Sequence, residues 1–179
     1  MVGSGTERYP KKFCIALALQ SKNKKISEKV MKMRKENPAR FSSAVGEAWM
    51  HCMFKVKYCH KIFDDEIYRE GMRILLLEAA YNNEIPMGEI GFDDNHVHFT
   101  ADIGMYSRDE IAKLLKGYTA KKFFEFFPEA KKKYFWDSGF WNPSYYIGSP
   151  KDMERTINYI KKQKYGERNY QTILSRYAS

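Results

Sequence analysis

Two histidines separated by one residue are the part of this sequence with the clearest potential for chemistry. His96 and His98 stand in "NHVHFTADIG" (95–104), where polar and apolar residues alternate. Alternate side chains of a strand project to the same face, so the two imidazoles would lie roughly 6–7 Å apart. Two imidazoles at that distance can share one divalent ion. The same triplet also occurs by chance, and many paired surface histidines bind nothing.

The residues around the pair indicate which face of the strand it occupies. An apolar row that alternates with a polar row packs against a core, so the polar row lies on the opposite face. The polar row here is His96, His98, Thr100 and Asp102, and the apolar row is Val97, Phe99, Ala101 and Ile103. We therefore expect the histidines on the side of the sheet away from the core.

A tyrosine and a glutamine near the C-terminal end add a second chemical feature. Tyr159 and Gln163 are four residues apart in "SPKDMERTINYIKKQ" (149–163), so they share one face of a predicted helix. A tyrosine away from the packed stripe is available for chemistry, although a merely exposed aromatic would look the same. Gly148 precedes this helix and is either a hinge for it or a turn glycine. The stripe expected to pack on the sheet is Met153, Ile157 and Ile160.

The hydrophobic pattern predicts the elements that position these side chains. Ser107 and Glu110 form a capping box, and Ser149 with Pro150 is typical of a helix start. The order β-α-β-β-α-β-α predicts an α+β, ferredoxin-like (RRM-like) split βαβ fold, with an antiparallel sheet, helices on one face and the other face free for a ligand. The expected strands are 48–58, 85–92, 96–103 and 141–148, and the expected helices are 64–83, 107–127 and 149–163.

Charge divides the 179-residue chain into three parts. Residues 1–44 contain 11 Lys and Arg and 3 Glu, whereas the other 135 residues contain 20 cationic and 19 acidic residues, which gives a net charge of +9 overall. We predict a basic N-terminal extension (1–44), a main domain (45–165) and a basic C-terminal tail (166–179). A basic arm on a nearly neutral body indicates a polyanion, with nucleic acid first, although it could also be a solvated segment.

The cysteines and the early apolar run bear on the compartment. Cys14, Cys52 and Cys59 are an odd and sparse set, which is typical of a reducing compartment. The run "FCIALAL" (13–19) is too short to span a bilayer and is short for a signal peptide, so we expect no membrane partner. The prediction is a cytoplasmic, nucleoid-associated protein.

Other residue groups invite a binding interpretation. Cys52 and Cys59 with His51 and His60 fit no common zinc-finger spacing, and strand parity sends His51 and Cys52 to opposite faces. The segment "AKKKYFW" (130–136) mixes charge with aromatics, as single-strand binders do, but an ordinary loop would look similar. We expect Trp136, Phe140 and Trp141 in the core. The candidates for contact with DNA are His51, Lys55, Lys57, Arg155 and Lys162.

Five blocks of the sequence resemble, in order, those of the single-tyrosine HUH transposases of the insertion-sequence 200/605 group. The blocks extend over about residues 47–163 and recur at family-like spacing, so the resemblance is specific. They are "HCMFKVKYCHKIF" (51–63), "NHVHF" (95–99), "LLKGYTAKKFF" (114–124), "FWDSGFWNPSYYIGS" (135–149) and "TINYIKKQ" (156–163).

The resemblance implies an activity and a role for each site residue. It implies that His96, His98 and Gln163 bind Mg²⁺ or Mn²⁺ and that Tyr159 is the nucleophile. The implied reaction is cleavage and rejoining of single-stranded DNA at insertion-sequence ends with subterminal hairpins, through a 5′-phosphotyrosine intermediate. It also implies a homodimer in which the tyrosine helix of one subunit serves the histidine pair of the other.

Three departures from the family pattern and two alternatives accompany this interpretation. Asn95 stands where an acid is usual, Phe54 where tryptophan is usual, and the N-terminal extension is long. One alternative is a domesticated relative that cleaves repeated hairpins. The other is a non-catalytic ferredoxin-like protein that binds single-stranded nucleic acid. The spacing of Tyr159 and Gln163 favours an enzyme, because binding alone requires neither residue.

Overall fold

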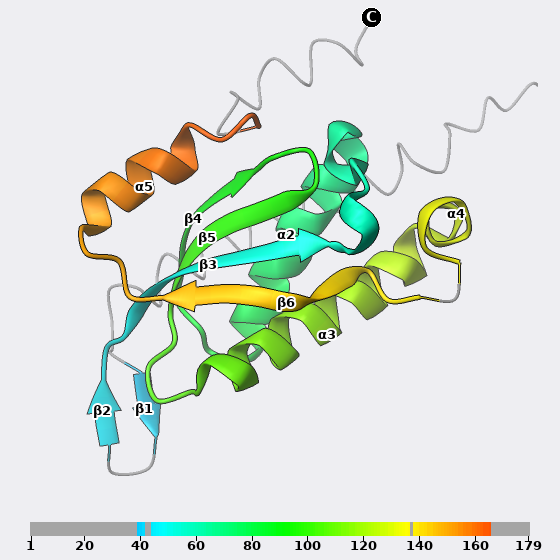
Figure 1. The fold of residues 1–179 in the computed structure, drawn as a ribbon. Coiled ribbons are helices and arrows are strands. Elements are labelled where there is room, and N and C mark those ends of the chain that lie inside the picture. The colour runs from blue at the N-terminus through cyan, green and yellow to red at the C-terminus, as the bar shows by residue number, and fades with distance from the viewer. Residues whose placement is uncertain (1–38, 42–43, 137, 166–179) are drawn as a thin grey trace, which may run out of the picture.

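The computed structural model describes residues 39–41, 44–136 and 138–165 (Figure 1). The predicted basic helix before Pro38, the early apolar run and the C-terminal tail lie outside the described residues. The strands are β1 (Ala39–Phe41), β2 (Ala44–Gly46), β3 (Trp49–Val56), β4 (Met87–Phe92), β5 (His96–Asp102) and β6 (Trp141–Gly148). The helices are α2 (Glu66–Asn82), α3 (Arg108–Phe126), α4 (Pro128–Ala130) and α5 (Met153–Lys161), with the helical turns η1 (Lys57–Cys59), η2 (Ile62–Asp64) and η3 (Lys131–Phe135).

The four longer strands form one antiparallel sheet in the order β4-β5-β3-β6. Helix α2 connects β3 to β4, and α3 connects β5 to β6, so each helix joins strands that are not adjacent in the sheet. This is the ferredoxin-like split βαβ topology that the sequence predicts, and the predicted α+β class is confirmed. Strands β1 and β2 pair separately as a short antiparallel ribbon (Figure 1).

The core lies between one face of the sheet and the helices α2 and α3, which pack against each other (Figure 1). Val97, Phe99 and Ala101 of β5 are fully buried, as the alternation in this strand predicts. The predicted capping box at the start of α3 is present: Ser107 Oγ accepts from the Glu110 amide, and the Glu110 carboxylate accepts from the Ser107 amide. None of the helices in the described part of the chain is long and apolar enough to cross a membrane.

The expectation that the second face of the sheet is free was wrong for its β4–β5 half. Helix α5 packs on β4 and β5, and Figure 1 shows it outside the layer formed by α2 and α3. On this face His98, Thr100 and Asp102 are buried although they point away from the main core. Thr100 accepts a hydrogen bond from the Glu89 amide, and Asp102 accepts from the amides of Ala48 and Gly104.

Three local predictions were also wrong. Helix α5 begins at Met153 and not after Ser149, because the Asp152 carboxylate accepts from the Arg155 amide and caps the helix there. Strand β3 ends at Val56, and Tyr58 turns into left-handed backbone with φ of 59°. Trp136 is 80% exposed, whereas its predicted core neighbours Phe140 and Trp141 are buried.

Candidate active site

His96 and His98 lie side by side on β5, on the face that α5 partly covers. Their ring centroids are 4.9 Å apart. His98 is 7% exposed, and His96 is half-buried. His98 pairs across the sheet with Met53 of β3 and Gly91 of β4, so it stands at the centre of three strands. The prediction that the two imidazoles share one face is confirmed.

Each of these histidines makes a hydrogen bond through its Nδ1 atom. Asn95 Oδ1 lies 2.8 Å from His96 Nδ1, and His51 Nε2 lies 3.0 Å from His98 Nδ1. The amide oxygen of Asn95 therefore occupies the role that an acid at this position would have, since it accepts a hydrogen bond from the N–H of His96 Nδ1. Among the described residues, neither Nε2 atom has a hydrogen-bond partner, so these nitrogens remain for a further ligand.

Burial keeps the central imidazole neutral. The pKa of His98 is lowered to about 4, first by burial and then by the neighbouring imidazoles of His96 and His51. Burial also lowers the pKa of His51. A histidine must be neutral to bind a metal ion, so the surroundings of His98 favour ligation down to acidic pH.

Tyr159 completes the cluster from the side of α5. Its ring centroid lies 5.3 Å from that of His98 and 6.2 Å from that of His51. Half of its surface, 50%, remains exposed. The phenol is therefore in contact with the histidine cluster and also open to a large ligand. One chain brings these groups together without a residue from a second copy.

A glycine in β4 allows α5 to approach the sheet closely. A Cβ atom at Gly91 would lie 2.2 Å from the Ile160 carbonyl oxygen and 3.1 Å from Gln163 Cγ. Gly91 is the cross-strand partner of His98, so this contact holds the C-terminal turn of α5 beside the histidine cluster. Ile160 is fully buried there, as its place in the apolar stripe predicts. Our sequence interpretation missed Gly91, although an isolated glycine inside a strand pattern is itself a signal of close backbone approach.

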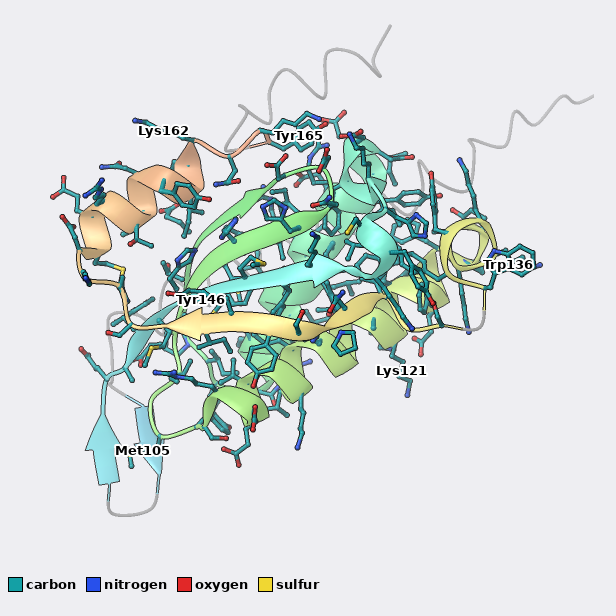
Figure 2. All side chains as sticks on the ribbon, in the orientation of Figure 1. Met105, Lys121, Trp136, Tyr146, Lys162 and Tyr165 are labelled. Carbon is teal, nitrogen blue, oxygen red and sulfur yellow. The ribbon has the colours of Figure 1, made fainter. Side chains whose placement is uncertain are left out.

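The chain beyond α5 is also held against the sheet edge. The Tyr165 amide donates to the Phe92 carbonyl over 2.9 Å, which forms an antiparallel bridge. The Tyr165 hydroxyl donates to the Asp64 carboxylate, and the Arg69 guanidinium lies 4.2 Å from the Tyr165 ring centroid. Figure 2 shows Tyr165 above the end of the β4–β5 hairpin. These contacts attach the segment after α5 to β4, which is the edge of the sheet opposite to β6.

A second exposed tyrosine lies on the same face of the sheet. Tyr146 of β6 is 48% exposed, and its ring centroid lies 5.5 Å from that of His51 (Figure 2). Its hydroxyl, however, turns back along its own strand and lies over Gly148, where a Cβ atom would be only 2.5 Å from it. The lack of a side chain at Gly148 is thus explained by the packing of Tyr146, and the hinge at this position stays a prediction.

The residues present fit a divalent metal ion. The donors that the sequence predicts would be the Nε2 atoms of His96 and His98 and the side-chain oxygen of Gln163, whose Nε2 donates weakly to the Tyr159 carbonyl over 3.5 Å. Imidazole and amide oxygen ligands suit Mn²⁺ as well as Mg²⁺. Within the described residues, no group of three or more His, Cys, Asp or Glu side chains is placed to hold a metal.

The predicted DNA contacts fall into two groups. Lys55 of β3 pairs across from His96 and is half-buried on the site face. Lys57 lies beyond the end of the strand, in η1, so the alternation of β3 does not extend to it and its place on the face of Lys55 stays a prediction. Arg155 and Lys162 are exposed on α5 and at its C-cap, where Figure 2 shows Lys162 on the outer side of the helix.

Comparisons with known proteins identify the class to which this fold and site belong. The family model described as "Transposase IS200 like" matches residues 44–163. The ISDra2 transposase TnpA of Deinococcus radiodurans is 28% identical over 116 residues, which are 63% of this chain and 81% of that protein. A solved structure of a candidate transposase, also from Deinococcus radiodurans, superposes with a TM-score of 0.56 at 24% identity. It covers 72% of this chain and 99% of its own, and it supports the fold alone.

The protein is therefore a transposase. More particularly, it belongs to the IS200-like family of transposases, since the family model spans the described domain from β2 to the segment after α5. The family resemblance seen in the sequence is thereby confirmed.

Proposed function

We propose that this transposase cleaves and rejoins single-stranded DNA at hairpin-bearing insertion-sequence ends, with Tyr159 as the nucleophile. The observation that carries the proposal is the position of Tyr159, 5.3 Å from the His98 ring and half exposed. The family match supports action on DNA. A protein that only binds single strands would require neither a tyrosine at this point nor a cluster of imidazoles.

The proposed reaction is an exchange of phosphodiester bonds. The Tyr159 oxygen loses its proton and attacks the scissile phosphorus, which forms a tyrosine–phosphate bond to the 5′ side. The bond from phosphorus to the 3′ oxygen breaks, and that oxygen takes up a proton and leaves as a free 3′-hydroxyl. Because the covalent link conserves the bond energy, attack by another 3′-hydroxyl rejoins strands and restores the tyrosine without ATP.

In this scheme, neighbouring side chains orient the two histidine rings. His51 holds the His98 ring through Nδ1, and Asn95 holds His96 in the same way, so that both Nε2 atoms face the site. Mg²⁺ or Mn²⁺ bound by His96, His98 and Gln163 would stabilise negative charge on the scissile phosphate. A free tyrosine has a pKa of about 10 and is a weak nucleophile at neutral pH, which is why the reaction needs such help.

We also propose that the protein works as a homodimer in which α5 is exchanged between subunits. Exchange of an identical element reproduces its contacts in the partner, so α5 would meet the same sheet surface in either arrangement. The segment 149–152, between β6 and α5, is where the two paths would separate. Mixing a Tyr159→Phe subunit with a His98→Ala subunit tests this: exchange predicts recovery of activity, and no recovery above the sum of the two would reject it.

The nucleophile is tested by trapping the covalent adduct. Wild-type protein with Mg²⁺ or Mn²⁺ and hairpin-bearing single-stranded DNA is expected to form a protein–DNA species that survives denaturing electrophoresis. Tyr159→Phe should form none. Tyr146→Phe is the matched control, because it removes a similarly exposed phenol from the same face, and it should retain the adduct. No adduct with wild type, or an adduct with Tyr159→Phe, would reject the mechanism and favour a binding protein.

A further inference from the structure

We propose that a basic aromatic corner at the η1–η3 end of the domain is a second contact for DNA, where unpaired bases stack on Trp136 and Tyr58. The corner patch is defined as Lys57, Tyr58, Lys131, Lys132, Lys133 and Trp136. The inference rests on the proposed function, because it assigns a place to single-stranded DNA that flanks the cleaved phosphate. It concerns residues that take no part in the histidine cluster.

The two aromatics of the corner patch are exposed to a degree that a folded domain rarely allows. Trp136 is 80% exposed and Tyr58 is 61% exposed, although both are large and partly apolar. The other described tryptophans are covered: Trp49 is half-buried, and Trp141 is buried and donates its indole N–H to Thr119 over 2.9 Å. Figure 2 shows Trp136 projecting outward beyond α4, away from the sheet.

The backbone holds both aromatics outward at a conformational cost. Tyr58 has φ of 59° and Trp136 has φ of 48°, a region that bulky residues rarely adopt. The Trp136 amide donates to the Lys131 carbonyl over 2.9 Å, which closes the turn that presents the indole. Unfavourable backbone of this kind concentrates at functional sites, because surrounding structure must maintain it.

The two segments that carry the corner patch are distant in the sequence but meet in the fold. The His60 ring lies between them, with its centroid 5.8 Å from that of Tyr58 and 5.6 Å from that of Tyr134. The Lys57 amide also donates to the Phe140 carbonyl over 2.9 Å, which ties η1 to the start of β6. The two aromatics therefore stand on a fixed support.

The charge around these aromatics fits a polyanion and not an apolar protein surface. Residues 55–61 contain three lysines, residues 131–136 contain three more, and neither segment contains an acid. Lys61 pairs with Asp94 over 3.3 Å, and the other five lysines carry the charge of this region. Lys131, Lys132 and Lys133 are all exposed. Aromatic platforms next to lysines are the combination that binds single strands, since bases stack on the rings while the lysines neutralise phosphates. An apolar protein surface would gain little from three adjacent exposed ammonium groups.

One DNA strand can reach from the histidine cluster to the corner patch. Strand β3 leads from His51 to Val56, directly before the patch, and at ~3.3 Å per residue this is about 17 Å. Lys55, which pairs across from His96, lies between the two. A strand that is cleaved at Tyr159 can therefore continue over Lys55 to the corner patch.

Fluorescence and binding titrations of the full chain test the proposal. Because Trp136 is the most exposed of the three tryptophans, binding of an unstructured oligonucleotide should quench wild-type emission. Trp136→Ala should abolish that quenching and lower the affinity about tenfold, and Tyr58→Ala should lower it similarly. Alanine at positions 131–133 should make the salt dependence, log K against log[salt], shallower by about 2. Met105→Ala, which removes another exposed apolar side chain, is the matched control and should change nothing.

The outcomes separate this proposal from the proposed function. A short oligonucleotide that reaches only the histidine cluster should give the wild-type adduct rate in Trp136→Ala at saturation. If wild type forms no adduct but the patch variants lose affinity, the catalytic proposal fails and the corner patch stands. Unquenched emission in the wild type, together with an affinity that Trp136→Ala leaves unchanged, would overturn the corner patch. Loss of self-association in sedimentation, with DNA affinity unchanged, would mean that the surface binds protein and would also overturn it.

Discussion

Replacing Gly91 by alanine should slow the attack of Tyr159 on DNA while the sheet and its histidines stay in place. The new methyl group would start 2.2 Å from the Ile160 carbonyl oxygen. An ordinary carbon–oxygen contact is about 3.3 Å, so the last turn of α5 must move by roughly 1 Å. A misplacement of about 1 Å can cost on the order of 100-fold in rate, and that is the loss we expect.

The same substitution has a bounded effect on stability. Overpacking a contact of this kind costs about 1–3 kcal/mol. The alternative is that α5 lifts from the sheet, which exposes the fully buried Ile160 and costs about 1.5–3 kcal/mol. Both routes give about 2 kcal/mol, or a fall in Tm of roughly 4–8 °C for a domain of this size. The fold should therefore survive the change.

The assay is the rate of the covalent adduct at saturating hairpin DNA, measured with Tm on the same samples. Gly117→Ala is the matched control, because a Cβ atom there meets nothing within 4 Å and the residue lies in the middle of α3. That control should gain about 0.5–1 kcal/mol and keep the wild-type rate. If Gly91→Ala also keeps the wild-type rate and Tm, α5 does not act from the position described, and the reasoning is refuted.

Three further predictions follow from other contacts. His51→Ala should weaken Mn²⁺ binding about 10- to 100-fold in calorimetry, because His98 loses its Nδ1 partner, and an unchanged affinity would exclude this positioning role. Ser107→Ala should lower the free energy of unfolding by about 1 kcal/mol through loss of the α3 cap, measured by urea denaturation, and no change would show that the cap contributes nothing. In a Cys14→Ser background, a thiol reagent at pH 8 should modify exposed Cys59 at once and Cys52 only on unfolding. Burial raises the pKa of Cys52 to about 12, so the thiol should stay protonated and unreactive when the pH is raised to 10. Fast labelling of both cysteines would contradict the structure.

The sequence was most informative where side-chain period and burial agree. Alternation in β5 placed His96 and His98 on one face, because a shift by one residue would expose Phe99 to water. The same logic gave α2, α3 and the four strands within a few residues. The side-chain period alone could not show that the chain leaves the strand before Tyr58. A tyrosine at this position continues the alternation of β3 whether it lies in the strand or in an exposed turn.

The contacts between elements were beyond the sequence for a different physical reason. Period shows which residues share a face, but the hydrogen-bond register between strands decides which residues meet. The pairing of Cys52 with Phe99 brings His51 diagonally to His98, and a shift that paired His51 with Asp102 would separate them. The contact of Asn95 with His96 could not be predicted for the same reason. An amide oxygen can replace a carboxylate oxygen as acceptor for the His96 N–H only when the backbone places it within hydrogen-bond distance.

The position of α5 links these two kinds of information. Its apolar stripe, which ends in buried Ile160, requires some apolar surface but does not specify which one. Gly91 supplies the specificity, because a side chain on β4 at that point would exclude the helix backbone. Since Gly91 pairs with His98, the residue that admits the helix is also adjacent to the imidazole that Tyr159 meets. Docking of α5 and assembly of the proposed catalytic site are therefore one event, in whichever subunit the helix originates.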